Sequence, residues 1–170
     1  RVPLEVIVMD DCAPVAAAQV LSAVTGVRFE RNAENLGFVR NCNRGASLAR
    51  GEHLLFLNND AVMMEGALEA LLAVCRAKAD AGAVGAKLVY PDGRLQEAGG
   101  IVWRDGSAWN YGRGDDPARP EYNYLREADY CSGACLLRPR PLCARHGRCR
   151  RRSPPAHCQD SDLCFKVLAP

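Results

Sequence analysis

Short apolar segments alternate with stretches of helical periodicity over the first 90 residues, and this alternation constrains the fold more than any other feature. The apolar segments cover residues 4–9, 27–30, 53–57 and 83–90, and the helical stretches cover residues 13–24, 38–49 and 65–79. Strands that alternate with helices form a sheet covered by helices, because crossovers between parallel strands are right-handed. We therefore expect an α/β fold built on a doubly wound, mostly parallel sheet.

Composition bounds the class of protein. The chain has 170 residues, 48% of them apolar, which fits a single domain over residues 1–170. A net charge of +2 is too small to favour nucleic-acid binding, and no apolar run is long enough to cross a bilayer. The nine cysteines are an odd number, and Cys12, Cys42 and Cys75 fall inside helical or strand-edge patterns, which favours free thiols in a reducing cytoplasm.

Two of the predicted strands end in carboxylates, at Asp10-Asp11 and at Asn58-Asn59-Asp60. Ligands of such sheets bind beyond the carboxyl ends of the strands. Asp60 could hold a divalent cation whose other ligands are diphosphate oxygens and water, or it could cap the helix that starts near Glu65. Asp11 could accept hydrogen bonds from a nucleobase or ribose, or could be a turn residue before Pro14.

Three further segments carry polar groups with both a functional and a structural interpretation. Gly37 precedes the predicted helix 38–49 and would let a ligand approach the backbone, although Asn-x-Gly is also ordinary turn chemistry. Ser132-Gly133 offers a hydroxyl and amides near a sugar or phosphate, or forms a plain turn. Asp160 could be a general base or a helix cap. Residues 99–130 lack periodicity and are predicted to form long loops over a substrate site.

Six segments follow one another in order: VIVMDD at 6–11, ENLGFVRNCNRGASLARGE at 34–52, LLFLNNDAVM at 54–63, VGAKLVYPDGRLQEAGGIV at 84–102, DYCSGACLLRPR at 129–140 and QDSDLCFK at 159–166. Together they resemble the family 2 glycosyltransferases of the GT-A fold, particularly the bacterial rhamnosyltransferase-like members. The resemblance implies metal-assisted, inverting transfer of a sugar from a UDP, dTDP or GDP donor to a hydroxyl acceptor. It also implies that the first strand and the C-terminal part of the family domain are absent from this sequence.

The resemblance implies a role for each candidate residue. Asp60 is the retained carboxylate of the family's DxD metal motif, with Asn58 in place of the first acid, and would bind Mg²⁺ or Mn²⁺. Asp160 is the base that takes the proton of the acceptor hydroxyl, and Ser132 and Gly133 belong to the donor and acceptor loop. The residues implied to bind the nucleotide are Asp11, Asn35, Gly37, Asn43 and Asn59.

The same resemblance predicts how the chain is organised and what it meets. Residues 1–97 would bind the nucleotide, and residues 98–170 would hold the acceptor and the catalytic base. The acceptor would be a growing surface polysaccharide or a lipid-linked saccharide, with no nucleic-acid partner. The full-length protein would work in the cytoplasm, associated peripherally with the inner face of the membrane.

Residues 141–158 depart from the family pattern. This segment is rich in arginine and lacks the expected aromatic residues, and Gln159 replaces the acid of the Glu-Asp motif, which suggests a locally altered reading frame. A zinc site is an alternative, with candidate ligands Cys131, Cys135, Cys143, His146, Cys149, His157 and Cys158. Two other functions stay open: a non-catalytic nucleotide-sugar-binding fragment, and a sugar nucleotidyltransferase, whose Gly-rich basic loop is missing from residues 10–16.

Overall fold

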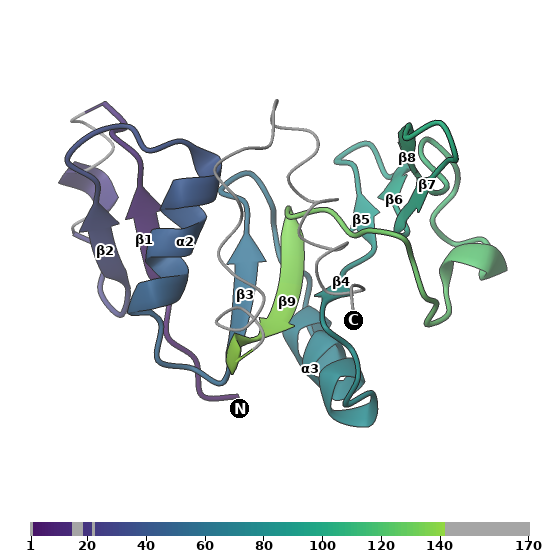
Figure 1. Cartoon of the computed structure of the whole chain (residues 1–170), viewed down its shortest axis with the longest axis horizontal. Coiled ribbons are helices and arrows are strands. Elements are labelled where there is room, and N and C mark those ends of the chain that lie inside the picture. Colours follow the sequence, from purple (N-terminus) through teal and green to yellow (C-terminus); the bar gives the residue numbers. More distant parts are fainter. Residues whose placement is uncertain (1, 15–18, 22, 142–170) are drawn as a thin grey trace.

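The computed structural model describes residues 2–14, 19–21 and 23–141, which form a mixed α/β fold (Figure 1). Its elements in chain order are β1 (Ile7–Asp10), β2 (Arg28–Arg31), α2 (Phe38–Leu48), β3 (His53–Leu57), α3 (Ala67–Ala77), β4 (Val84–Gly85), β5 (Leu88–Val89), β6 (Leu95–Glu97), β7 (Gly100–Val102), β8 (Ala108–Asn110), the 3₁₀ helix η1 (Pro120–Tyr122) and β9 (Cys135–Pro139). Of the predicted helix 13–24, residues 19–21 are helical, and residues 15–18 and 22 lie outside the described part.

The described residues form the expected mixture of helices and strands, but their strands make small separate sheets and not one doubly wound, mostly parallel sheet. Their one parallel pair is β1 with β2, in the register Ile7 to Arg28. A separate sheet has the order β3-β9-β4, and β9 runs antiparallel to both of its neighbours. The physical reason is that a late segment of the chain returns to pair between two strands that are close in sequence, so the pairing of β3 with β4 is replaced.

Two hairpins extend the fold beyond β4. The segment 83–90, predicted as one strand, divides into β4, which pairs with β9, and β5, which pairs with β6. Residues 99–130, predicted as loops, contain the antiparallel hairpin β7–β8 and η1. These strands of three residues are too short to show a periodicity in the sequence.

Both helices pack as their sequences predict. The small residues of α2 allow close approach to β1, since a Cβ at Gly45 would lie 2.9 Å from Met9 Cγ. The amphipathic α3 buries Leu71 and Leu72 against the β3-β9-β4 sheet. Its apolar face completes the core formed by Leu71, Leu72, Val84, Cys135 and Leu137.

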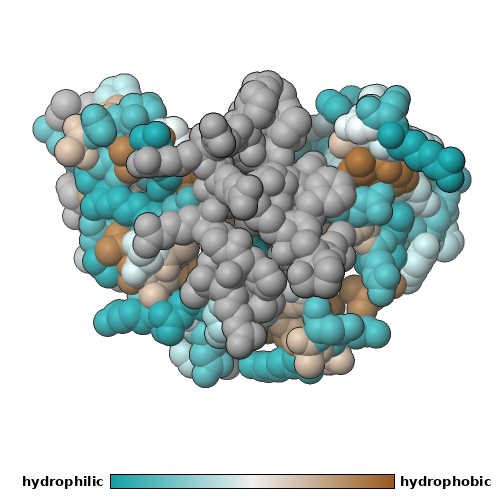
Figure 2. Space-filling model, in the orientation of Figure 1, coloured by the Kyte–Doolittle hydropathy of each residue, from teal (hydrophilic) through white to brown (hydrophobic). Residues whose placement is uncertain are grey.

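Polar residues dominate much of the visible surface. On the face drawn in Figure 2, hydrophilic residues cover most of both ends of the molecule, and hydrophobic residues appear in small groups. Within residues 2–14, 19–21 and 23–141, no helix has the length and apolar character needed to cross a membrane.

Candidate functional site

The carboxylate of Asp11, one residue beyond β1, organises the loop of residues 32–37, called here the Asn32 loop. It accepts hydrogen bonds from the backbone N–H groups of Leu36 (2.7 Å) and Gly37 (2.8 Å) and from the side-chain amide of Asn32 (2.6 Å). Burial alone would raise the pKa of Asp11, but the hydrogen bonds from Leu36, Asn32 and Gly37 outweigh it and hold the pKa below its ordinary value. Asp11 is therefore an ionised anchor for the loop, and contact with a nucleoside stays a prediction.

Asn32 is the centre of the polar contacts beneath this loop, and the sequence did not single it out. Its side chain is 5% exposed, and its amide nitrogen also donates to Asn41 Oδ1 at 2.9 Å. Its Oδ1 accepts a hydrogen bond from Arg44 on α2. An asparagine can connect three elements in this way because its amide carries both donors and an acceptor. The sequence feature that could have identified Asn32 is its position directly after the strand that forms β2.

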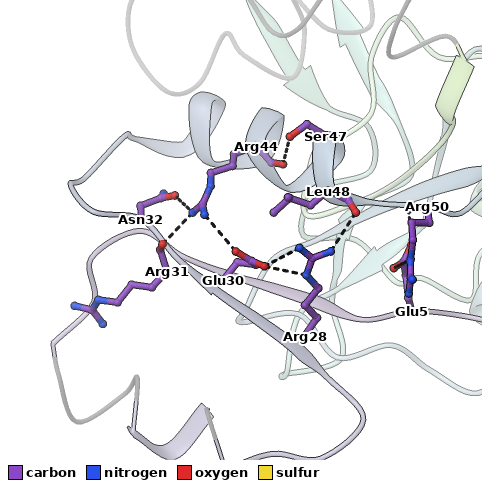
Figure 3. A network of polar contacts seen from close by, with 9 residues as sticks. All are labelled: Glu5, Arg28, Glu30, Arg31, Asn32, Arg44, Ser47, Leu48 and Arg50. Atoms are coloured by element: carbon purple, nitrogen blue, oxygen red, sulfur yellow. Dashed lines mark hydrogen bonds and ion pairs between the residues drawn. The ribbon is translucent and has the colours of Figure 1, made fainter.

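Arg44 joins α2 to the end of β2 (Figure 3). One of its nitrogens, Nη1, donates to the Arg31 carbonyl at 3.0 Å, and Nη2 lies 3.2 Å from Glu30 Oε2. Glu30 also pairs with Arg28 at 2.8 Å. Since these groups are partly exposed, we read the network as one that fixes the position of α2 more than it adds stability.

Gly37, the last residue of the Asn32 loop, leaves open space beside the backbone. Its φ of 74° and ψ of 162° suit glycine, and a Cβ placed there would meet no atom within 4 Å. Asn35 Oδ1 accepts a hydrogen bond from the Gly37 N–H at 3.0 Å, so Asn35 shapes the turn. Asn43 is half-buried on α2. The space before Gly37 is open to a ligand, and the roles of Asn35 and Asn43 in binding one stay predictions.

Asp60 does not cap a helix, so that alternative is wrong. The cap of α3 is Gly66, which makes no side-chain capping bond, and the helix begins at Ala67. Asn58 and Ala61 instead close a turn after β3, through a hydrogen bond of 3.1 Å between their backbones. Asn59 and Asp60 are exposed at the tip of this turn. The carboxylate of Asp60 is therefore accessible to a ligand.

A metal ion at Asp60 would need ligands from outside the described protein. In residues 2–14, 19–21 and 23–141 there is no group of three His, Cys, Asp or Glu side chains that could hold a metal. A single exposed carboxylate fits a magnesium or manganese ion that completes its shell with phosphate oxygens and water. It does not fit a structural zinc site, and the zinc alternative finds no support from Cys131 or Cys135, the candidate ligands that are described.

The turn of residues 132–134, called here the Ser132 turn, lies beside Asn58. Because β9 is antiparallel to β3, with Leu57 opposite Cys135, the start of β9 meets the end of β3. The Asn58 N–H donates to the Ala134 carbonyl at 3.0 Å. The predicted donor and acceptor loop thus contacts the turn that bears Asp60, the predicted metal residue.

Glu97, at the end of β6, holds the Ser132 turn and was missed by the sequence reasoning. It is 1% exposed, and its Oε1 accepts a hydrogen bond from the Ser132 N–H at 2.9 Å. The feature that could have identified Glu97 is its place two residues after the fully buried Leu95, on the same face of the strand. Buried acids need strong partners, so Glu97 ties β6 to this turn.

The fold and this cluster define a class of α/β protein with polar groups gathered beyond the ends of β1 and β3. A family model described as "Glycosyl transferase family 2" matches residues 2–142. The chain belongs to glycosyl transferase family 2.

Two curated relatives add detail. The protein y4gI of Sinorhizobium fredii is 30% identical over 149 residues, which cover 84% of this chain and 16% of that protein. The O-antigen biosynthesis protein RfbC of Myxococcus xanthus is 42% identical over 67 residues, which cover 39% of this chain and 5% of that protein. The chain therefore spans less than a fifth of the length of either relative.

Several predicted residues lie outside the described part of the chain. They are Asp160 and Gln159, and the candidate zinc ligands Cys143, His146, Cys149, His157 and Cys158. Just before the arginine-rich segment, Arg138 is buried on β9, and the Arg140 N–H donates to the Glu52 carbonyl at 2.8 Å. The roles of the catalytic base and of the basic segment stay predictions.

Proposed function

We propose that this chain transfers a sugar from a nucleotide-diphosphate donor to a hydroxyl group of an acceptor, with inversion at the anomeric carbon. One observation carries the proposal. Three segments lie on the same side of the fold (Figure 1). They are the Asn32 loop after β2, the turn bearing Asp60 after β3 and the Ser132 turn before β9. This is the edge at which ligands of open α/β sheets bind.

The first of these segments is the proposed place of the nucleotide. Gly37 leaves open space beside the N-terminus of α2, where backbone N–H groups and the helix dipole favour an anion. Asp11 keeps that backbone in position, and Asn35, Asn43 and Asn59 supply further amides near the donor.

The second segment is the proposed place of the diphosphate. Asp60 would hold Mg²⁺ or Mn²⁺, which stabilises the negative charge of a departing diphosphate when bound. The Asp60 carboxylate supplies the protein ligand, and the Asn58 side chain adds no charge to it. The Ser132 turn would position the donor sugar against the acceptor, and Asp160 would accept the proton of the acceptor hydroxyl.

The acceptor class is a finer part of the proposal. RfbC is described as an O-antigen biosynthesis protein, and the ordered segments of this chain resemble rhamnosyltransferase-like sequences. Both support a growing surface polysaccharide or a lipid-linked saccharide as acceptor.

The proposal is tested by titrating the protein with UDP, dTDP and GDP, each with and without Mn²⁺, in a calorimeter. We expect one of the three to bind in a metal-dependent manner, and the matching nucleotide sugar to be hydrolysed or transferred. If none of the three binds under either condition, the proposal is wrong.

A second candidate function is binding of a nucleotide sugar without transfer. Gln159 favours it, because an amide stands where the family has the acid of its Glu-Asp motif. Metal-dependent nucleotide binding with no turnover of any UDP, dTDP or GDP sugar would support this candidate. Gain of turnover in Gln159→Glu would then show that the lost acid is the cause.

A further inference from the structure

The two tryptophans of this chain lie exposed on one face of the β7–β8 hairpin. Trp103 is 57% exposed and Trp109 is 59% exposed. Trp109 pairs with Ile101, and the Trp103 N–H continues the register by donating to the Ser107 carbonyl at 2.8 Å. Since side chains alternate across a strand, this register puts both indole rings on the same face as diagonal neighbours.

The opposite face of the hairpin is covered. Tyr130 packs its ring against Gly100, where a Cβ would lie 2.1 Å from the ring. The Tyr130 hydroxyl donates to Asn110 Oδ1 at 2.7 Å, and the Gly100 N–H donates to the Tyr130 carbonyl at 2.8 Å. The hairpin therefore meets the rest of the protein through the edge of β7 and the face at Gly100, and it presents the indole rings on the other face.

The hairpin does not need the indole rings to form its turn. Asp105 accepts hydrogen bonds from the Ser107 N–H at 2.9 Å and from its hydroxyl at 2.7 Å, and Gly106 takes a φ of 85°. The contacts that close the turn are thus made by other residues and by the backbone of Trp103. Two large apolar rings left in water call for another explanation.

Polar groups border the indole of Trp109. An open depression of about 370 Å³ is lined by Trp109, Gly112, Arg113, Gly114 and Asp115. Asp115 is held by Arg119 at 2.7 Å and by the Tyr122 hydroxyl at 2.9 Å. The guanidinium of Arg113 is exposed and makes no polar contact with the described residues, so it can donate to a ligand.

The hairpin is joined to the candidate site by a short path. Tyr130 is two residues before Ser132, and Asp129 accepts a hydrogen bond from the Val102 N–H at 2.8 Å. A molecule bound to the tryptophan face would thus sit on a hairpin that is hydrogen-bonded to the segment just before the Ser132 turn.

We propose that the face carrying Trp103 and Trp109 is a saccharide-binding subsite, which, if the proposed function holds, receives the sugar chain of the acceptor. A pyranose ring has an apolar C–H face that stacks on an indole, and equatorial hydroxyl groups that accept hydrogen bonds from an arginine such as Arg113. Two indole rings on one face, with a polar depression beside Trp109, match both requirements.

Area and charge argue against other occupants. The two tryptophan residues together expose roughly 300 Å², far less than the ~800 Å² that each partner buries in a stable protein complex. Residues 99–116 carry two arginines (104 and 113) and three aspartates (105, 115 and 116), so the hairpin has no cationic surplus for an anionic membrane. The rings fit one or two sugar units.

The experiment uses the indole N–H signals, of which this chain has two, in NMR spectra of the ¹⁵N-labelled protein. Trp103→Phe and Trp109→Phe assign them. The probes are malto-, cello- and xylo-oligosaccharides and rhamnose-containing oligosaccharides at millimolar concentrations. We expect at least one to shift both signals, and Trp103→Ala and Trp109→Ala each to weaken its binding by about tenfold or more. Tyr124→Ala, which removes another exposed ring (62%), is the matched control and should leave binding unchanged.

Three outcomes would overturn the proposal. They are no shift with any saccharide, equal binding in the alanine variants, and shifts caused only by anionic phospholipid vesicles, which would indicate a membrane-facing hairpin. Titration of the same variants with UDP, dTDP and GDP separates this proposal from the proposed function. If the alanine variants lose saccharide binding but keep nucleotide binding, the effect belongs to the hairpin and not to the nucleotide site. If the native protein binds a saccharide but none of the nucleotides, the saccharide subsite stands and the proposed transferase function is wrong.

Discussion

Replacement of Asp11 tests whether its carboxylate holds the Asn32 loop. Asp11→Ala removes the acceptor of three hydrogen bonds, from Asn32, Leu36 and Gly37. A hydrogen bond to a charged group contributes about 1.5–3 kcal/mol. Because the three share one partly exposed carboxylate and are not additive, we expect a total loss of about 2–4 kcal/mol.

Asp11→Asn is the more discriminating variant. Its amide can keep an oxygen towards Leu36 and Asn32 but must turn its NH₂ group towards the Gly37 N–H, so about 1–2 kcal/mol should be lost. The assays are urea unfolding at pH 7 and hydrogen exchange of the Leu36 and Gly37 amides, which should lose protection. Asp92→Asn is the control, because that exposed carboxylate is held by Arg94 in a different turn.

The sign of the pH dependence follows from the lowered pKa of Asp11. Its folded value lies below the ordinary 3.8, so the stabilisation is complete at neutral pH and is lost as the pH falls through the folded value. The difference in unfolding free energy between the native protein and Asp11→Asn should therefore shrink below pH 3.8. A difference that is absent at pH 7, or unchanged in acid, would refute the anchoring role.

Two further predictions concern the backbone of the site. Gly37→Ala should cost about 1–3 kcal/mol of unfolding free energy, because a side chain there is strained by φ alone and touches no neighbour; unchanged urea unfolding would contradict this. Glu97→Gln should keep the bond to the Ser132 N–H and most of the thermal stability, whereas Glu97→Ala should lower the midpoint by several degrees and raise the KM for a nucleotide sugar that is turned over. Equal midpoints for the two Glu97 variants would show that the bond does not hold the turn.

The sequence predicted the elements that depend on local patterns. The strand 53–57 matches β3 in both bounds, because a continuous apolar run is bordered by Gly51-Glu52 and by Asn58. The helices 38–49 and 65–79 are confirmed as α2 and α3, with ends shifted by up to two residues. Local periodicity is enough to fix such elements.

Long-range pairing could not be predicted in the same way. No local pattern states that Cys135 will pair with Leu57, so the antiparallel position of β9 was missed. The partner of Glu97 is 35 residues away in the sequence, and Asn32 meets Arg44 only after α2 has packed on β1. The contact of the turn bearing Asp60 with the Ser132 turn follows from the same pairing, so the sequence proposed candidate residues without their arrangement.

The central claim is that Asp60 supplies the protein ligand for a metal that binds together with a nucleotide diphosphate. The direct measurement is calorimetric titration of the nucleotide that binds best, with and without Mn²⁺, into the native protein and Asp60→Asn. Asp80→Asn, an exposed aspartate beyond the far end of α3, is the matched control. We predict that Mn²⁺ strengthens nucleotide binding to the native protein and to Asp80→Asn. In Asp60→Asn, the factor by which Mn²⁺ strengthens nucleotide binding should be at least about tenfold smaller. Equal dependence on Mn²⁺ in all three proteins would contradict the claim.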